Sequence, residues 1–452
     1  MEKQTPLYKA VSEYIAKDTS RFHMPGHKGL YLRRVTEPVP FSEAYRYDVT
    51  EVKGTDSLYE ASGAILETEK AFAKIYGASC TLLSAGGATL CVQAMLALVA
   101  KEGGTIIAGR SLHISAVNAM ALLGLSPIWV QPDGCAGGGI GGRITPESIA
   151  EKLKEAPQSC AVYITTPDYF GIMSDIAGIA KICKEYNVPL LVDNSHGAHL
   201  KFMSPSLHPM DLGADMCCDS LHKTMPVLTG GALLHIKNEQ YIAEAKAKMA
   251  LFGSTSPSYL IMLSCDTCLN YIDRGEVAQE FEAVQVHVKA LEKLALKKGF
   301  ATITGARDYT KIILSVYNWG LTAEEFSNKL RESGIEAELV SDVWAVLMAS
   351  PENIGGDYRR VEKFLNAWER PSVGALPQPQ PLPLPEQVTK LRDAIFAQCK
   401  TVAVADCVGE IAAHMVCKCP PGAPIIMPGE QITSQLAELL KISGKEQIKV
   451  VL

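Results

Sequence analysis

The 452-residue sequence predicts an α/β protein with a mostly parallel seven-stranded sheet and a smaller α+β region toward the C-terminus. Two observations predict this fold class. Short apolar runs without alternating polarity recur through the first 240 residues, and such runs are typical of strands buried on both faces. Helical segments lie between most of these runs, and strands that alternate with helices form parallel sheets covered by helices.

The expected elements follow one another in a regular order. A helix over residues 61–77 ends at Gly77, and a second helix over 88–103 follows the first strand. Because a loop and no helix separates the last two strands, we expect the final strand to run antiparallel. The seven expected strands cover residues 81–85, 105–109, 127–131, 161–165, 188–193, 215–219 and 231–236.

The pattern changes after residue 240. Residues 240–300 are helical in pattern, and a second αβ pattern follows, with a strand at 311–319 and a helix from Thr322, which Glu325 helps to cap. Strands are expected at 336–340 and 344–349, and the prolines of 371–386 predict an extended linker. The predicted organisation is an N-terminal segment, a large domain, a small αβ domain, the linker and a C-terminal region, at residues 1–60, 61–300, 301–370, 371–386 and 387–452.

Composition excludes several classes of function. A formal net charge of −6 gives no basic surface for nucleic acid. The first residues lack the apolar core of a signal peptide, and no apolar run is long enough to predict a membrane span. The 13 cysteines are scattered, as reduced thiols of a cytoplasmic protein are. Cys265 and Cys268 form a CxxC pair without a second one, so we expect neither a zinc nor a redox site there.

A glycine-rich turn follows the first strand and opens a helix. In Gly86-Gly87-Ala88-Thr89, the free N–H groups and the helix dipole suit a phosphate. The segment is not a Walker loop, because no Gly-Lys-Ser/Thr follows it. The alternative is a tight turn that binds no ligand.

Two further strand ends carry reactive side chains. Ser220, His222 and Lys223 follow the strand at 215–219, and Asp193 ends the strand at 188–193. A lysine that forms a Schiff base needs a cationic or desolvated setting, and pyridoxal phosphate needs a carboxylate beside its pyridine nitrogen. The alternative for Asp193 is a helix cap, and for Lys223 a solvated surface residue. The order of turn, carboxylate and lysine favours a pyridoxal phosphate enzyme.

Three histidines lie near these strand ends. His196 and His199 are three residues apart, but no general-base Glu stands between them as in zinc proteases, so we expect no metal and a ring contact for His196. His113 follows the strand at 105–109 and is expected to stack on the cofactor ring. An ordinary loop histidine is the alternative for His113.

These residues together resemble the ornithine/lysine/arginine decarboxylase family, which has the aspartate-aminotransferase-like fold type I of pyridoxal enzymes. The resemblance spans nearly the whole chain and is closest to the short members of the family. Its motifs are the PGHK segment within 22–29, the acidic segment 48–58, the Asp-to-His stretch 193–199, the lysine motif 220–223 and the PPG…PGE segment 420–430.

The sequence departs from the family pattern at four places. Ser57 replaces a second Asp, and Asn194-Ser195 replaces Glu-Ala. The glycine-rich turn lacks the usual hydroxyl pair. The context of His113, Arg-Ser-Leu-His-Ile-Ser, differs from the usual Asn-Cys-His-Lys-Ser.

The resemblance implies a role for each candidate residue. Lys223 would carry pyridoxal 5′-phosphate as a Schiff base, Asp193 would pair with the pyridine nitrogen, and His113 would stack on the ring. Lys223 or a nearby histidine would return a proton to Cα. The residues implied to bind phosphate are Gly87, Ala88, Thr89, Ser220 and His222.

The implied reaction is decarboxylation of arginine, lysine or ornithine to an amine. Asp56 and Glu430 are the implied contacts for a basic side chain, and the N-terminal segment would contribute to the active site of a homodimer or higher homo-oligomer. Transamination or lyase chemistry on the same fold is one alternative. A pyridoxal-binding protein without catalysis is another.

Overall fold

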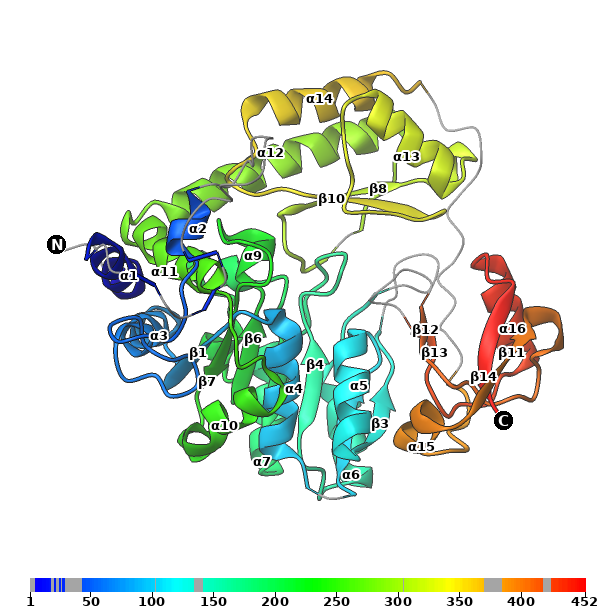
Figure 1. Ribbon diagram of the computed structural model, residues 1–452. Coiled ribbons are helices and arrows are strands. Elements are labelled where there is room, and N and C mark those ends of the chain that lie inside the picture. Colours follow the sequence, from blue (N-terminus) through cyan, green and yellow to red (C-terminus); the bar gives the residue numbers. More distant parts are fainter. Residues whose placement is uncertain are drawn as a thin grey trace. The chain divides into compact units, whose positions relative to one another are not determined.

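The computed structural model describes residues 5–17, 20–21, 24–25, 27–28, 43–101, 103–133, 141–303, 305–369, 384–417 and 424–452. Its largest sheet has seven strands in the order β1-β7-β6-β5-β4-β2-β3 (Figure 1). Their bounds are Cys80–Ser84 (β1), Thr105–Gly109 (β2), Ser126–Val130 (β3), Val162–Thr165 (β4), Leu190–Asp193 (β5), Met216–Asp219 (β6) and Ala232–Ile236 (β7). The predicted mostly parallel sheet is confirmed, and β7 runs antiparallel to both β1 and β6, as expected.

The chain divides into two compact units. The first unit comprises residues 1–98 and 191–278, and the second comprises 99–190 and 279–452. The boundaries predicted from the sequence for the individual domains stay a prediction. Most of the Pro-rich segment, residues 371–383, lies outside the described residues.

The first unit places helices around the β1-β7-β6 part of the sheet. The helix α3 (Ala64–Tyr76) buries Ile65, Phe72 and Tyr76, and it ends at Gly77, whose φ of 69° is left-handed. The buried Asp266 joins three helices, because it accepts Thr68 Oγ1 at 2.6 Å and the backbone nitrogen of Tyr8 at 2.9 Å. The remaining elements are α1 (Pro6–Ala16), α2 (Ala44–Tyr47), α4 (Gly87–Val99), η1 (Ala198–Phe202), α8 (Pro209–Leu212), α9 (Leu221–Thr224), η2 (Glu239–Tyr241), α10 (Ile242–Phe252) and α11 (Tyr259–Asp273).

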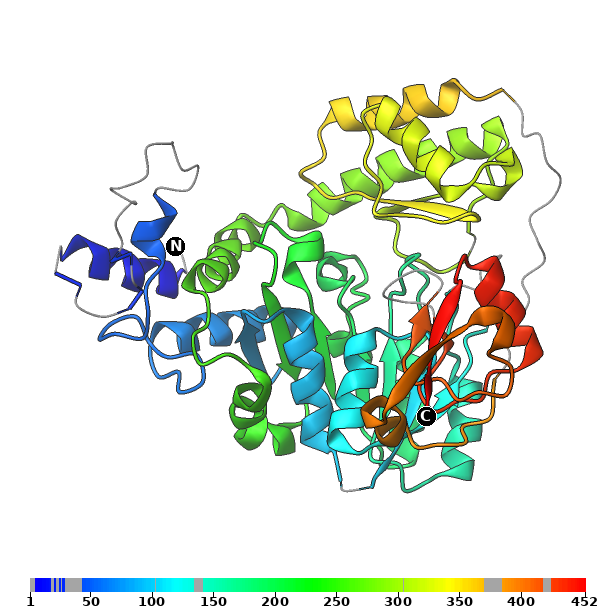
Figure 2. The same cartoon turned by 45° about the vertical axis from the view of Figure 1, so that its right-hand side comes forward.

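The second unit contains a separate three-stranded antiparallel sheet, β8-β10-β9. Helices α12 (Val277–Lys298), α13 (Ala323–Glu332) and α14 (Gly355–Asn366) lie on one face of it (Figures 1 and 2) and share an apolar core with it. The predicted cap of α13 is present, because Thr322 Oγ1 accepts the Glu325 amide at 3.2 Å and Glu325 Oε2 accepts the Thr322 amide at 2.9 Å. The strands are β8 (Lys311–Ser315), β9 (Leu339–Val340) and β10 (Trp344–Met348), and η3 covers Tyr317–Trp319.

Two further parts belong to the second unit. Helices α5 (Ile114–Leu123) and α6 (Pro146–Glu155) connect its strands of the large sheet, and α7 (Ile176–Glu185) lies between β4 and β5 in the chain. The C-terminal region has its own core of buried residues that includes Ile426, Leu436 and Val450. Its elements are α15 (Leu391–Phe396), β11 (Cys399–Ala403), η4 (Val404–Asp406), β12 (Val416–Cys417), β13 (Pro424–Ile426), α16 (Ser434–Ile442) and β14 (Gln447–Val451). Among the described residues, no helix is both long and apolar enough to span a membrane.

Candidate active site

Asp193 is the last residue of β5 and is buried. Its Oδ1 accepts the amide of Ser195 at 3.1 Å, the hydroxyl of Ser195 and the thiol of Cys218 at 3.5 Å. Cys218 is the residue paired with Asp193 in the parallel ladder between β5 and β6. These donors fix a carboxylate at the end of a central strand.

Lys223 and His196 come together in the first unit. The Nζ of Lys223 lies 3.0 Å from Nε2 of His196. His196 is buried in the segment after β5, and Lys223 is half-buried in α9, which follows β6 directly. Because β5 and β6 are neighbouring parallel strands, their carboxyl ends bring these two segments side by side.

His222 also lies in α9, and its hydrogen bond fixes its tautomer. Its Nδ1 lies 3.1 Å from the carbonyl oxygen of Gly231, which can only accept, so Nδ1 carries a proton. Burial, together with the charge of Lys223, lowers the pKa of His222 despite this hydrogen bond. Ser220 is buried beside it and makes no capping hydrogen bond with its side chain.

The glycine-rich turn opens α4 as predicted. Ser84 Oγ accepts the amide of Gly86 at 3.1 Å and donates to the carbonyl of Gly87 at 2.9 Å. Gly87 has a φ of 68°, and a Cβ built there would meet no atom within 4 Å. The next amides, of Ala88 and Thr89, belong to the first turn of α4, where a helix offers no acceptor. The open space beside Gly87 and these amides of the first turn together suit an anion.

The second unit holds His113 and Glu430. His113 is the N-cap of α5, and its Nδ1 accepts the amide of Ser115 at 3.1 Å. Glu430 is fully buried, and both of its carboxylate oxygens bind Arg110, at 2.5 and 2.8 Å. Arg392 donates to the carbonyls at the other end of α5. The C-terminal region is therefore bound both to the loop before α5 and to its last turn.

Asp56 already has several hydrogen-bond partners. Its carboxylate accepts the amides of Ser62 at 3.0 Å and of Gly63 and Ile65 at 2.9 Å each, at the start of α3. Burial alone would raise the pKa of Asp56, but these amides and that of Ser57 lower it. The role of Asp56 as a contact for substrate stays a prediction, as does that of Glu430.

A buried group behind these strand ends escaped the sequence reasoning. His208, Cys217 and Asp219 have potential ligand atoms within 4.8 Å of one another. The oxygens of Asp219 accept Nε2 of His208 at 2.9 Å, Nε2 of His235 at 3.2 Å and the side-chain amide of Asn194 at 2.7 Å. The one signal in the sequence is a charged residue at the end of an otherwise apolar run.

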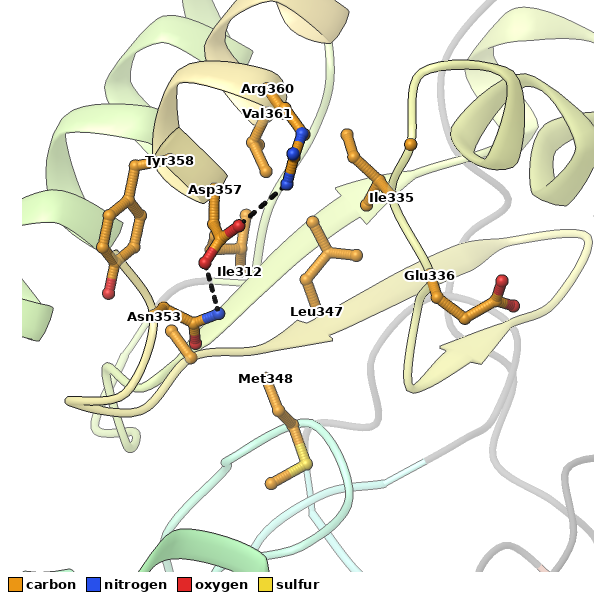
Figure 3. Close-up of a pocket in the computed structure, with 12 residues that line it drawn as sticks. Ile312, Ile335, Glu336, Leu347, Met348, Asn353, Asp357, Tyr358, Arg360 and Val361 are labelled. Carbon is orange, nitrogen blue, oxygen red and sulfur yellow. Dashed lines mark hydrogen bonds and ion pairs between the residues drawn. The ribbon is translucent and has the colours of Figure 1, made fainter. Parts of the chain in front are cut away.

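A pocket in the small αβ part contains none of the predicted site residues. Its floor includes Ile312 and Leu347, and the carboxylate of Asp357 on its rim is paired with Arg360 at 3.0 Å (Figure 3). Asn353 completes this pairing from the same side. Of the polar groups that line the pocket, Asp357, Arg360 and Asn353 are thus paired with one another, and Glu336 is paired with Arg331.

The comparisons with known proteins agree with this geometry. Residues 5–304 match the major domain of Orn/Lys/Arg decarboxylases, and residues 378–447 match their C-terminal domain. The chain belongs to the Orn/Lys/Arg decarboxylase family. As such, it is a pyridoxal-phosphate-dependent amino acid decarboxylase, as the resemblance in the sequence implied.

Relatives cover nearly the whole chain. An arginine decarboxylase of Bacillus subtilis (strain 168) is 29% identical over 96% of this chain and 92% of its own length. One of Halalkalibacterium halodurans is 29% identical over 99% of this chain and 95% of its own.

Solved structures share the fold at low identity. A lysine decarboxylase of Francisella novicida has a TM-score of 0.84 at 19% identity, over 100% of this chain and 82% of that one. A serine palmitoyltransferase of Sphingomonas wittichii has a TM-score of 0.55 at 12% identity, over 66% of this chain and 74% of that one. The predicted fold type I is confirmed.

Proposed function

We propose that this decarboxylase acts on a basic L-amino acid and uses Lys223 to hold pyridoxal phosphate. The observation that carries the proposal is the 3.0 Å contact between Lys223 Nζ and His196 Nε2, on a segment adjoining Asp193. The names of the relatives, arginine and lysine decarboxylases, support a basic substrate.

The residues of the first unit fit the cofactor. A primary amine, a buried carboxylate at a strand end and an open helix N-terminus match its aldehyde, pyridine nitrogen and phosphate in turn. Lys223 would hold the aldehyde carbon, Asp193 the ring nitrogen, and Ser220, His222 and the first amides of α4 the phosphate. His113 would stack on the ring.

The bound cofactor would supply the electron sink that accepts the bonding pair when the Cα–carboxylate bond breaks. The chain would control the protons. One proton replaces the carboxylate on Cα, so carbon dioxide and an amine leave. Lys223 and His196 already share a hydrogen bond through which a proton can be held near the reacting carbon. The hydrogen bonds from Ser195 hold the carboxylate of Asp193 in place for the ring nitrogen.

The basic head group of the substrate would need a carboxylate, and Asp56 and Glu430 are the proposed contacts. Glu430 now binds Arg110, and Asp56 binds backbone amides. A substrate cation would share these carboxylates or displace a partner. We further propose that the protein is a cytoplasmic homodimer or higher homo-oligomer.

The test is carbon dioxide and amine release from arginine, lysine, ornithine and neutral amino acids, with pyridoxal phosphate added. We expect one basic amino acid to react, and Lys223→Ala to lose the reaction and the borohydride-stable cofactor adduct. Lys237→Ala is the matched control, because Lys237 lies in the same unit and its amine donates to the carbonyl oxygen of Gly77, away from the site residues that the structure describes. Amino-group transfer or elimination without carbon dioxide would overturn the proposal.

A further inference from the structure

Asp219 is a fully buried carboxylate that the proposed chemistry does not use. It ends β6, and four residues later comes Lys223. Its Oδ1 accepts the side-chain amide of Asn194 at 2.7 Å, and its Oδ2 accepts the two histidine rings of His208 and His235. All these partners are themselves fully buried.

The hydrogen bonds of this group cross four neighbouring strands. Thr81 of β1 lies 2.8 Å from Nδ1 of His235 on β7, and His235 binds Asp219 on β6. Asp219 in turn binds Asn194, the residue after β5. The order β1-β7-β6-β5 is the order of the strands in the sheet. We call these residues, with His208, the Asp219 network.

The network carries a single negative charge. A carboxylate only accepts, so both histidines donate from Nε2. Nδ1 of His208 accepts the amide of Met210 at 3.3 Å, which makes that ring neutral. Burial lowers the pKa of His235 even though Asp219 opposes this, so that ring is neutral as well. Burial would raise the pKa of Asp219, but His208 and His235 hold it well below its usual range.

Among the described residues, the two thiols and the phenol that border the carboxylate do not cancel this charge. Burial raises the pKa of Cys91 to about 12 and raises the pKa of Tyr76 and Cys217 well above their ordinary values. All three stay protonated near neutral pH. The charged groups that the described neighbouring elements bring near it include Asp193, at the end of β5, which adds a second negative charge. Lys201 and Asp211 pair with each other at 2.7 Å.

The network bridges the same two segments that Lys223 and His196 bridge. Asn194 and His196 are two residues apart, and Asp219 and Lys223 are four apart. The two segments are therefore cross-linked twice, by the contact of Asn194 with Asp219 at 2.7 Å and by the contact of His196 with Lys223 at 3.0 Å. A side chain buried at 0% cannot move without its partners, so the first bridge limits how far the second can open.

We propose that Asp219 is a positioning residue for Lys223. Asp219 fixes the ends of β5 and β6 through its hydrogen bond with Asn194, and it places a buried negative charge behind the proposed cofactor-binding turn. The inference rests on the proposed role of Lys223. A negative charge in a medium of low polarity stabilises a cation on the lysine nitrogen more than it would in water. Asp219 would thus act on the nitrogen of Lys223 in two ways, by fixing the position of its segment and by its negative charge.

The experiment uses the cofactor-loaded protein without substrate. The absorbance of the bound cofactor is titrated with pH, and the cofactor dissociation constant is measured for Asp219→Asn and Asn194→Ala. Asp219→Asn should lower the midpoint pH by about one unit, because it removes the charge. Asn194→Ala keeps the charge and loosens the bridge, so it should weaken cofactor binding by about 3- to 10-fold with a smaller midpoint shift.

Cys217→Ala is the matched control. Cys217 lies on the same strand, two residues before Asp219, and is equally buried, but it contributes no charge. It should lower thermal stability and leave the midpoint and the dissociation constant unchanged. If Asp219→Asn does not fold, Asn194→Ala and its dissociation constant carry the test.

The outcomes separate this inference from the proposed function. Equal loss of stability in Asp219→Asn and Cys217→Ala, with the midpoint and dissociation constant of wild type in all three variants, would mean that Asp219 only stabilises the fold. A wild-type protein that takes up no borohydride-reducible cofactor on Lys223 would overturn the proposed function itself. A larger midpoint shift in Asp219→Asn than in Asn194→Ala, with weaker binding in Asn194→Ala, supports the inference.

Discussion

Nζ of Lys223 and Nε2 of His196 lie 3.0 Å apart, on two segments that leave neighbouring parallel strands at the same edge of the sheet. One of the two nitrogens donates and the other accepts, so the pair holds the lysine amine in a defined direction. A half-buried lysine without such a partner would sample several rotamers. The pair is therefore the local feature that would orient Lys223 for its proposed role.

Replacing His196 should weaken the attachment of the cofactor. His196→Ala removes one hydrogen bond, and we expect the cofactor dissociation constant to rise by about 3- to 10-fold. His196→Gln can still bond to the amine and should lie between wild type and His196→Ala. Absorbance titration with pyridoxal phosphate measures this, and the exposed His414→Gln is the control. Equal affinities for wild type and His196→Ala would show that the contact does not orient the amine.

His222 should make phosphate binding depend on pH. Its Nδ1 donates to Gly231, and its pKa is lowered, so in the free protein Nε2 has no proton to give to a phosphate. Binding the phosphate through Nε2 requires the protonated ring and raises its pKa. Affinity should then be highest below the pKa of the free protein and be lost as pH rises through the pKa of the complex.

The measurement is the cofactor dissociation constant between about pH 6 and pH 8.5. In His222→Gln, an amide donates at every pH, so the slope that comes from His222 should vanish. The titration of the phosphate itself is common to both proteins and cancels in the comparison. Identical slopes for the two proteins would remove His222 from the phosphate site.

The sequence predicted the parts of this fold that depend on local pattern. Buried strands, the left-handed end of α3 at Gly77 and the Thr322–Glu325 cap each follow from a few adjacent residues. The placement of Asp193 and Lys223 at one edge followed from parallel topology alone. Two strands of the second αβ pattern were predicted too long. Residues 317–319 form η3, which ends at Gly320 with a φ of 64°. Of the strand expected at 336–340, only Leu339–Val340 forms β9.

The contacts that escaped prediction join residues distant in the chain. Arg110 and Glu430 are 320 positions apart, and Thr81 and His235 are 154 apart. Each of these residues taken alone reads as an ordinary strand or loop position. Only the packed sheet shows that Asp219 has three donors, and a single sequence carries no information on which distant donors meet.

Asp56 should stabilise the start of α3. Its carboxylate accepts the amides of Ser62, Gly63 and Ile65, which would otherwise be unpaired at the helix N-terminus. Asp56→Ala should lower the free energy of unfolding by about 1–2 kcal/mol. Urea unfolding without cofactor measures this, and Glu60→Ala, at an exposed position four residues later, is the control. A variant with unchanged stability and a raised KM would instead point to a contact with the substrate alone.

Because of Asp168, the free energy of unfolding should fall as pH rises from about 4 to 6. Burial raises its pKa to about 6, even though the amides of Gly142, Phe170 and Ile172 favour the ionised form. The folded state thus keeps a proton that the unfolded state loses near pH 4. Because the raised carboxyl pKa favours folding only at low pH, this contribution is full below pH 4 and is lost as pH rises to 6.

The comparison of wild type with Asp168→Asn isolates this effect. As pH rises over that range, the unfolding free energy of wild type should fall by about 2 kcal/mol relative to that of Asp168→Asn. Urea midpoints at four or five pH values measure it. A difference that stays constant with pH would mean that Asp168 is ionised throughout, and that Lys311 compensates its burial.

The buried pair of Arg110 and Glu430 should be costly to break from either side. The exposed fraction of Arg110 is 2% and that of Glu430 is 0%, and removing one partner leaves an uncompensated charge. Arg110→Met or Glu430→Gln should each lower the unfolding free energy by about 3–5 kcal/mol, and the double variant should lose far less than the sum. The more solvent-accessible pair of Lys400 and Glu410 in the C-terminal region is the matched control and should contribute less than about 1 kcal/mol.

The same variants decide whether Glu430 also binds the substrate. If it does, Arg110→Met frees a carboxylate and should lower KM for the basic amino acid, whereas Glu430→Gln should raise it. If Glu430 only anchors the C-terminal region to the loop before α5, both variants should change KM in the same direction, because both release the same loop. KM changes of opposite sign in the two variants would therefore establish the contact of Glu430 with the substrate. KM changes of the same sign would mean that Glu430 pairs with Arg110 and does not bind the substrate.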